Sequence, residues 1–208
     1  MKTNSIPGNI FVTAIGTDSG KTVVSAILCE ALGAAYWKPI QAGLPRDTDT
    51  VSSLVANPSF KALPEKYLLQ TPASPHAAAK IDKINISVGD FEVPGKDLTI
   101  IEGAGGCMVP VNETEFVIDI SAHLRCEIVV VANLYLGSIN HTLLTLHLLR
   151  SRNLPVKGII FNGIPNVESE RIILHHSALP CLLRIAQEPL IDRERISHYA
   201  KELLKNWK

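Results

Sequence analysis

Short uninterrupted apolar segments, separated by stretches of helical pattern, constrain the fold of this chain more than any other feature. Four are rich in aliphatic residues, many of them β-branched, and a weaker fifth follows: Ile10–Ala14, Leu98–Ile101, Glu127–Ala132, Val156–Phe161 and Cys181–Ile185. A strand covered on both faces reads as a continuous apolar run, whereas a strand with one wet face alternates apolar and polar residues. The pattern therefore predicts a parallel sheet with a covering layer on each face.

Three stretches between or after these runs have helical patterns. Lys21–Leu32 carries only Glu30 as a charge after its first residue, so this helix is expected to be buried on nearly all sides. Asn140–Arg152 is rich in leucine and closes on two arginines, as the helix dipole favours, and Ile191–Trp207 is amphipathic. Alternating strands and helices predict an α/β fold with a doubly wound, mostly parallel sheet and helices on both faces. A length of 208 residues favours one domain over residues 1–208.

The stretch Pro58–Asp97 breaks this alternation. Prolines interrupt it repeatedly and its last part shows no helical period, so we expect mostly irregular chain with one short helix near Pro75–Lys80. A loop of this length inside a compact domain is usually functional or conceals a further element.

Basic and acidic residues balance in this chain, with 20 Lys and Arg against 20 Asp and Glu. A formal net charge of zero argues against a broad basic surface for nucleic acid, although it permits a small anion held locally. The chain has no uninterrupted apolar run of about 18 residues, so no membrane span is expected. The residues before Ile10 are polar, so no signal peptide is expected either.

The cysteines lie far apart and form no CxxC pair; they are Cys29, Cys107, Cys126 and Cys181. Three of them stand in or beside apolar runs, which is typical of buried structural thiols. A zinc site needs paired ligands, and the neighbours His175 and His176 have no cysteine or acidic partner at ligand spacing. We therefore expect a cytoplasmic protein without a structural metal.

The segment Phe11–Thr22 carries the strongest functional signal. An apolar strand leads into a glycine-containing turn, and Gly20, Lys21 and Thr22 open a helix. Backbone N–H groups at such a helix start point at an anion, a lysine there reaches the β- and γ-phosphates of a nucleotide, and the hydroxyl can ligate Mg²⁺. The strict phosphate-loop pattern places a glycine one residue before Gly16. The alternative, a turn with a solvated lysine, is disfavoured by the flanking strand and helix.

A second motif ends the strand-like run that begins at Leu98. The run delivers one carboxylate, Glu102, at its carboxyl end, and Gly-Ala-Gly-Gly follows. Open α/β sheets bind ligands at the carboxyl ends of their strands, where a Mg²⁺–nucleotide site needs an acidic group. Glycines such as Gly105 and Gly106 let the backbone approach a phosphate or substrate closely. The alternative for this motif alone is a strand that ends in an ordinary surface turn.

A third segment, Tyr36–Gly43, ends a short apolar stretch with Lys38 and a proline. Because proline restricts the residue before it, the lysine side chain is expected to be directed rather than free. Asp47 and Asp49 follow, and we expect these charges at the same edge of the sheet as the other two motifs. Taken alone, Lys38 reads equally well as a solvated lysine at a strand end.

These motifs, with Ser74-Pro75-His76 and with Leu136–Thr142, occur in a fixed order along the chain. In that order they resemble the dethiobiotin synthetases, biotin-pathway ligases of a deviant phosphate-loop group that also includes cobyrinate amidases and partition ATPases. The resemblance runs from about Phe11 to Asn162 and more thinly to Pro189. Its most specific parts are Glu-Gly-Ala-Gly-Gly, Leu-Gly-x-Ile-Asn-His and Ser-Pro-His in combination.

The resemblance implies roles for the residues that match the family's motifs. Toward ATP, Lys21 would hold the phosphates together with Gly20, Thr22 and Val23, and Asn162 would read the adenine. The residues implied around Mg²⁺ are Thr22, Asp49 and Glu102.

The resemblance also implies a substrate site. Lys38 and Thr17 would lie beside the substrate carbamate and the transferred phosphoryl group, and Gly105 and Gly106 would contact the substrate. The substrate's carboxylate would bind to the partner subunit of a homodimer, at a helix N-terminus formed by Leu136, Gly137 and Asn140.

The implied reaction converts 7,8-diaminononanoate, CO₂ (or bicarbonate) and ATP into dethiobiotin, ADP and phosphate. The diamine forms a carbamate, and the γ-phosphoryl group passes to it to give a carbamic-phosphoric anhydride. The second amine then closes the ureido ring and displaces phosphate. Phosphoryl transfer is mostly positioning and charge neutralisation, which two lysines and Mg²⁺ can supply.

Some positions depart from the family pattern. Ala14 stands where the loop begins with glycine, and Ala42 stands where a small hydroxyl residue is common near the substrate. Asp18 replaces the usual glutamate, a milder change. After Leu183 the usual glycine is missing, which leaves the base contacts beyond Asn162 open.

The alternative function is a nucleotide-binding regulatory ATPase, or a protein of the same fold group without ligase turnover. A partition-type ATPase carries an additional lysine early in the loop, where this chain has Gly16. An amidase would append a glutamine-hydrolysing domain, for which 208 residues leave no room. His76 is predicted either to line the substrate channel or to be structural.

Overall fold

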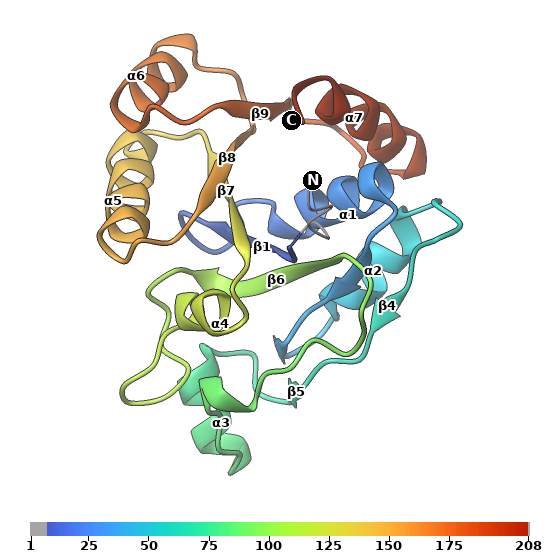
Figure 1. Ribbon diagram of the computed structural model, residues 1–208, viewed down its shortest axis with the longest axis vertical. Coiled ribbons are helices and arrows are strands. Elements are labelled where there is room, and N and C mark those ends of the chain that lie inside the picture. The colour runs from blue at the N-terminus through green and yellow to red at the C-terminus, as the bar shows by residue number, and fades with distance from the viewer. Residues whose placement is uncertain (1–7, 208) are drawn as a thin grey trace, which may run out of the picture.

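In the computed structural model, which describes residues 8–207, seven parallel strands form a sheet in the order β4-β2-β6-β1-β7-β8-β9 (Figure 1). These strands are β1 Ile10–Ala14, β2 Ala35–Trp37, β4 Ala62–Leu63, β6 Thr99–Gly106, β7 Glu127–Asn133, β8 Val156–Asn162 and β9 Cys181–Ile185. A separate parallel pair consists of β3 Ile40–Ala42 and β5 Tyr67–Leu69. Residues 1–7, on which the signal-peptide prediction bears, lie outside the described range.

Helices cover both faces of the seven-stranded sheet, as Figure 1 shows. One face carries α1 Lys21–Leu32, α2 Asp47–Leu54 and α7 Arg193–Asn206. The other face carries α3 Pro75–Asp82, the 3₁₀ turn η1 Val88–Asp90, α4 Val117–His123, α5 Ser138–Ser151 and α6 Val167–Ser177. The prediction of a doubly wound α/β fold with a parallel sheet is therefore confirmed.

Each strand divides its side chains between two buried cores. On β1, Val12 packs with the core under α1 and α7, whereas its neighbour Phe11 packs with the core under α4 and α5. Successive side chains of a strand point to opposite faces, so a strand between two cores must be apolar at every position. This geometry explains why the sequence shows continuous apolar runs instead of alternation.

The structure confirms the five predicted strands and changes some of their ends. β1 and β9 have the predicted bounds, and β7 and β8 are each one residue longer. β6 begins one residue later than predicted and continues through the glycines to Gly106. The short strands β2 and β4 were not predicted as strands, because two or three residues carry too little pattern and are held by pairing with their neighbours.

The prediction that Pro58–Asp97 is mostly irregular is confirmed, because fewer than half of its residues lie in a helix or strand, but it missed three short elements. This stretch contains β4, β5 and η1 in addition to the helix expected near Pro75–Lys80, which is confirmed as α3. The two strands exist because each pairs in parallel with a strand distant from it in the sequence. Such pairing is a tertiary effect that leaves no local period.

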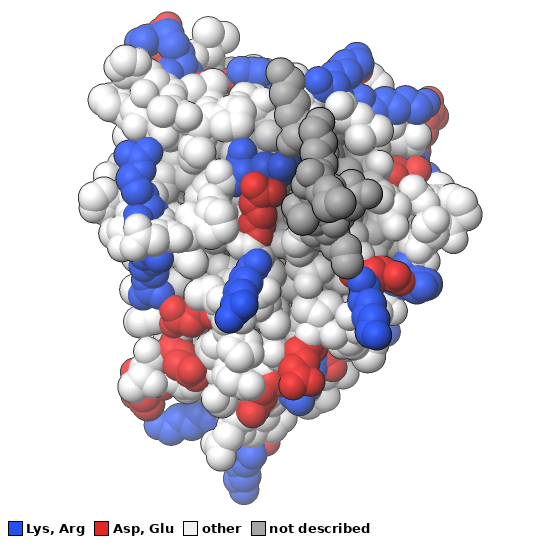
Figure 2. Space-filling model, viewed as in Figure 1, with Lys and Arg blue, Asp and Glu red and all other residues white. Residues whose placement is uncertain are grey.

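The cysteines are free thiols, and Cys29, Cys107 and Cys126 are buried, as predicted. Burial raises the pKa of Cys126 to about 12, so this thiol is unreactive at neutral pH. On the face seen in Figure 2, basic and acidic side chains are interspersed. No helix within residues 8–207 is long and apolar enough to cross a membrane.

The close approach of β9 to β8 depends on Gly158, since a Cβ there would lie 2.7 Å from both Leu182 Cγ and the Pro180 carbonyl oxygen. We expect Gly158→Ala to lower the free energy of unfolding by about 1–3 kcal/mol, because the backbone beside it must move. Urea denaturation measures the loss. Gly89→Ala is the control, since the atom nearest to a Cβ there, Ser87 Oγ, is 3.7 Å away. Equal losses in both variants would contradict this packing.

Candidate active site

The strands β1, β2, β6 and β8 end at one edge of the sheet because all of them are parallel. The glycine-containing loop follows β1, Lys38 follows β2, Glu102 lies within β6, and Asn162 ends β8. The motifs that the sequence singled out are therefore brought together by the topology. This edge is where open α/β sheets bind their ligands.

The loop between β1 and α1 ends at Gly20, whose φ of 92° lies in the left-handed region that favours glycine. Val24 N–H donates to the Gly20 carbonyl, which closes the first turn of α1. The N–H groups of the preceding helix residues, Lys21, Thr22 and Val23, lack a carbonyl acceptor within the helix. They form a helix N-terminus of the kind that binds phosphate.

Lys21 is bent back over this loop. Its Nζ donates to the Gly16 carbonyl at 3.1 Å, and the residue is only 7% exposed. Burial lowers the pKa of Lys21, and the nearby charge of Lys38 lowers it further. The ammonium of Lys21 thus lies in a place where an added anion would stabilise its charge.

The carboxylate of Glu102 is the centre of the site and is 1% exposed. Lys38 Nζ donates to Glu102 Oε1 at 2.9 Å, and Thr22 Oγ1 lies 3.0 Å from the same oxygen. The other oxygen accepts a hydrogen bond of 3.0 Å from the Tyr36 hydroxyl. Burial and the neighbouring Glu102 raise the pKa of Tyr36 well above its ordinary value, so this phenol remains a donor.

Lys38 joins Glu102 to a second carboxylate. Its Nζ also lies 2.7 Å from Asp47 Oδ2 and donates to the Gly103 carbonyl at 3.2 Å, so all three of its protons have acceptors. Burial by itself would lower the pKa of Lys38, but the charges of Glu102 and Asp47 outweigh burial and raise it. Lys38 is therefore a permanently charged, fixed group and not the solvated lysine of the alternative reading.

The acidic residue beside Lys38 is Asp47, whereas Asp49, the residue predicted to bind Mg²⁺, lies apart from Lys38. Asp47 begins α2, and Thr22 Oγ1 lies 3.1 Å from its Oδ1. Asp49 lies two residues further along the helix, about 200° around its axis, so it points away from the cluster. Its side chain is 57% exposed and pairs with Arg46 at 2.6 Å.

Gln41 is a positioning residue that the sequence did not reveal. It is 5% exposed, and its Oε1 accepts the backbone N–H of Asp47 at 3.1 Å. Its Nε2 donates to the Gly43 carbonyl at 3.1 Å. The amide side chain thus ties the start of α2 to β3 and fixes Asp47. Tyr36 was also missed. It stands two residues before Lys38, and residues two apart along a strand point to the same face, so this spacing could have revealed it.

A cavity of about 670 Å³ opens above these groups. Among the predicted residues, those that line it are Thr17, Gly20, Lys21, Thr22, Lys38, Glu102 and Gly105. Gly106 packs on the loop instead, since a Cβ there would lie 3.4 Å from the Ala14 carbonyl oxygen. Pro72–Pro75 forms one wall, and there the Ser74 hydroxyl is within 3.2 Å of His76 Nδ1.

Asn162 contacts the glycine-containing loop directly. Its Nδ2 donates to the Ser19 carbonyl at 2.9 Å, and a Cβ at Gly20 would collide with its amide. A second cavity of about 520 Å³ begins just beyond Asn162, between Ile164–Pro165 and residues 186–189.

The segment Leu136–Asn140 does not line the large cavity of its own chain. Leu136 is fully exposed, and Gly137 caps the N-terminus of α5 with a φ of 104°. Asn140 lies on the first turn of α5, beside a groove that also contains Leu144 and His147. The structure thus separates these three predicted residues from the rest of the site in one chain.

Comparison with known proteins places the chain among ligases. The AAA domain family matches residues 8–195. The ATP-dependent dethiobiotin synthetase of Cytophaga hutchinsonii is 50% identical over 201 residues, which is 95% of this chain and 97% of that protein. The enzyme of the same name from Brucella ovis is 44% identical and covers 88% of this chain and 86% of that protein. The enzyme of the same name from Christiangramia forsetii is 43% identical and covers 96% of this chain and 98% of that protein.

Solved structures of more distant proteins share the fold. The septum site-determining protein MinD of Pyrococcus horikoshii, solved with Mg-ADP, has a TM-score of 0.58 at 17% identity, covering 95% of this chain and 88% of that one. A ParA family ATPase of Chlorobium tepidum has a TM-score of 0.55 at 16% identity, and the match covers 96% of this chain and 90% of that one. The fold is that of the phosphate-loop NTPases.

Removing the charge of each buried lysine should change the free energy of unfolding in opposite directions. Lys21→Met removes a charge that burial and Lys38 disfavour, so we expect the ligand-free protein to gain about 1 kcal/mol. Lys38→Met leaves Glu102 and Asp47 without their cation, so we expect a loss of about 3–5 kcal/mol. Urea denaturation near neutral pH measures both changes, and a loss of similar size in both variants would contradict the different environments.

The pH dependence follows from the lowered pKa of Lys21. Between that pKa and the ordinary value of 10.5, the unfolded chain binds more protons at this lysine than the folded chain does. The stability of the wild type therefore rises with pH in this window, and the advantage of Lys21→Met should shrink. The penalty of Lys38→Met should persist there, because the pKa of Lys38 is raised above 10.5.

Proposed function

The chain belongs to the dethiobiotin synthetase family of ATP-dependent ligases in biotin biosynthesis, and we propose that it closes the ureido ring of dethiobiotin from 7,8-diaminononanoate, CO₂ and ATP. The observation that carries the proposal is the buried cluster of Lys38, Glu102, Asp47 and Thr22 beside a phosphate-binding helix start. That cluster places a fixed cation and two carboxylates where a γ-phosphoryl group would meet a substrate.

The residues fit Mg²⁺-ATP by the chemistry of their donors. Mg²⁺ prefers carboxylate and hydroxyl oxygens, and those of Asp47, Glu102 and Thr22 converge in the cavity. The single hydroxyl proton of Thr22 serves two carboxylate oxygens, so one of them is left with an unused lone pair. When bound, Mg²⁺ neutralises charge on the nucleotide phosphates. In this proposal Asp47 takes the place of Asp49 as a metal-binding residue.

Each side chain has a distinct task toward ATP. Lys21 exchanges its contact with the Gly16 carbonyl for the phosphates, which restores its charge in a buried place. The backbone N–H groups of Gly20, Thr22 and Val23 hold the phosphates from the helix start. Asn162, which contacts the loop beside Gly20, reads the adenine toward the second cavity.

The second set of residues handles the carbamate. One substrate amine adds to CO₂ with loss of a proton, and a carbamate oxygen then attacks the γ-phosphorus with ADP as leaving group. Lys38 and Thr17 hold the carbamate and the transferred phosphoryl oxygens, and Gly105 allows the backbone to approach them. The second amine then attacks the carbonyl carbon, expels phosphate and loses its proton. Lys38 acts by position and charge, since its raised pKa keeps it protonated.

We further propose a homodimer in which the partner completes the substrate site. Leu136, Gly137 and Asn140 stand at the N-terminus of α5, where a helix dipole favours a carboxylate. They do not line the cavity of their own chain, and Leu136 offers a fully exposed apolar side chain for contact with another subunit. The aliphatic chain of the diamine would extend from Lys38 to this helix start.

Asp47, the metal-binding residue of this proposal, and Asp49, the one implied by the family resemblance, provide a matched pair of variants. In a coupled assay of ADP release with diaminononanoate, bicarbonate and Mg-ATP, we expect Asp47→Asn to lower kcat by about 10²-fold or more, as for loss of an electrostatic catalytic group. Asp49→Asn should stay within about twofold of the wild type, because its side chain lies in solvent. Addition of more Mg²⁺ should partly restore the rate of ADP release in Asp47→Asn.

The same assay tests the proposed function itself. ADP release that does not depend on the diamine would argue against the ligase reaction and favour a regulatory nucleotide-binding protein. Equal activity of both aspartate variants would argue against the cluster as the metal site.

Mixed dimers test the shared substrate site. Lys21→Ala disables the phosphate loop, and Gly137→Val distorts the N-terminus of α5 because its φ of 104° excludes a branched residue. Suppose that each active site combines the phosphate loop of one subunit with the α5 N-terminus of the other. Random mixing of the two inactive variants should then restore about a quarter of the wild-type activity, because about half of the dimers are mixed and each mixed dimer has one intact site of two. No recovery after mixing and refolding would show that each subunit uses its own segment.

A further inference from the structure

We propose that Asp119 and Arg152 are positioning residues for the diamine, because they hold the loop after β6 in the place where Val109 contacts the aliphatic part of that substrate. The loop comprises residues 107–116, between β6 and α4. Asp119 and Arg152 themselves do not line the large cavity. The inference rests on the proposed function, because it concerns the substrate end of the same site.

Val109 brings the loop into contact with the site. Of residues 107–116, only Val109 lines the large cavity. A Cβ at Gly105 would lie 2.8 Å from Val109 Cγ2 and 3.7 Å from Thr17 Oγ1, so Val109 lies close to the place that the proposed function gives to the carbamate. An apolar side chain there suits the methylene chain of a diamine, because binding removes apolar surface of both from water.

Two backbone hydrogen bonds from α4 fix this part of the loop. The Val117 N–H donates to the Val109 carbonyl at 2.9 Å, and the Ile118 N–H donates to the Cys107 carbonyl at 3.2 Å. Val117 and Ile118 are the first residues of α4, and N–H groups at a helix start have no acceptor within the helix. The position of Val109 therefore follows the position of the start of α4.

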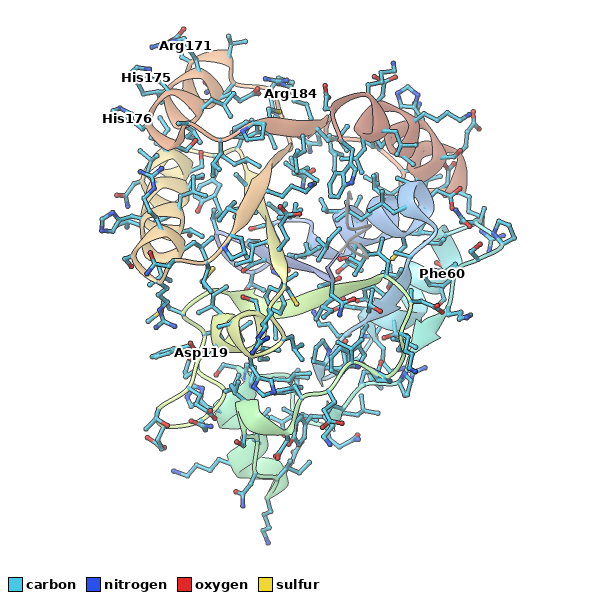
Figure 3. The ribbon with its side chains drawn as sticks, viewed as in Figure 1. Phe60, Asp119, Arg171, His175, His176 and Arg184 are labelled. Carbon is cyan, nitrogen blue, oxygen red and sulfur yellow. The ribbon has the colours of Figure 1, made fainter. Side chains whose placement is uncertain are left out.

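Asp119, labelled in Figure 3, fixes the start of α4. Its Oδ2 accepts the Phe116 N–H at 2.7 Å, and its own N–H donates to the Phe116 carbonyl at 2.9 Å. Such a reciprocal pair closes the first turn of a helix. The last residue of the loop is thus joined to α4 by the same side chain that contacts Arg152.

Arg152 holds this arrangement from the end of α5. Its Nη1 pairs with Asp119 Oδ1 at 2.5 Å, and its guanidinium carbon lies 5.8 Å from the centre of the Phe116 ring. Its Nη2 lies 3.9 Å from Met108 Sδ. One cation therefore contacts both ends of the loop. The side chains of Arg152 and Asp119 are 32% and 30% exposed, so removing one does not leave a fully buried charge.

The loop also contacts the opposite wall of the cavity. The Pro110 carbonyl accepts the His76 N–H at 3.2 Å, and α3 there follows the wall formed by Pro72–Pro75. A shift of the loop would therefore move the substrate side of the cavity. The phosphates of ATP are held from the start of α1, on the other side of β6, so binding of the diamine and binding of ATP should separate on mutation.

Steady-state assays of diamine-dependent ADP release by the whole protein test this separation. In Arg152→Met we expect KM for the diamine to rise about tenfold, while kcat and KM for ATP stay within about twofold of the wild type, as for a lost contact away from the reacting atoms. Asp119→Asn keeps an acceptor for the Phe116 N–H and should raise KM for the diamine by less. Arg152→Lys, which keeps the charge, should restore part of the affinity.

A double variant tests whether the effect passes through Val109. Val109→Ala alone should raise KM for the diamine and leave KM for ATP unchanged. Combined with Arg152→Met, it should raise KM for the diamine by less than the product of the two separate effects, because both changes remove the same contact. Fully multiplicative effects would overturn the inference.

Arg171→Met is the matched control, since Arg171 also pairs with a carboxylate, Glu168 at 3.0 Å, but on α6 and well apart from Asp119 (Figure 3). It should change neither KM. An unchanged KM for the diamine in both Arg152→Met and Asp119→Asn, or an equal rise in KM for the diamine and for ATP, would overturn the inference and leave the proposed function intact. A wild type without diamine-dependent ADP release would overturn both.

Discussion

Glu102 is held out of water at the carboxyl end of β6, where an unpaired carboxylate would cost several kcal/mol. Its compensation comes from three different elements, through the ammonium of Lys38 after β2, the hydroxyl of Thr22 on α1 and the phenol of Tyr36 on β2. Loss of any one of these partners would leave the buried carboxylate with a hydrogen-bond acceptor unsatisfied. The geometry of the site is therefore coupled to the burial of Glu102.

The cluster also gives Lys38 and Lys21, which look alike in the sequence, different electrostatic environments. Lys38 is surrounded by two carboxylates and a carbonyl, which fix its charge. Among residues 8–207, Lys21 has only the Gly16 carbonyl within hydrogen-bond distance, and burial and the charge of Lys38 disfavour its charged form. A polyphosphate would relieve Lys21 and leave Lys38 in position. The net charge of zero thus conceals a concentrated arrangement of charge at one edge of the sheet.

Several site residues were predictable because strand ends and motif spacing are local features. Parallel strands end at one edge, so Lys38, Glu102 and the glycines had to lie near the phosphate loop once the apolar runs were recognised as strands. The choice between Asp47 and Asp49 was not predictable in this way. It depends on where α2 begins, and the hydrogen bond from the Asp47 N–H to the Gln41 side chain decides that. Gln41 itself carries no motif and gains its role only through burial.

The sequence by itself determined the α/β class, the parallel sheet, the phosphate loop and the family, because these follow from apolar periodicity and from residues that are close in the chain. Only the tertiary structure decided which aspartate joins Lys38, how β4 and β5 form within Pro58–Asp97, and why Leu136–Asn140 stands apart from its own cavity. The physical reason is the range of the interactions involved. Backbone preference and burial pattern act over a few residues, whereas ion pairs and strand pairing join positions that only the folded chain brings into contact.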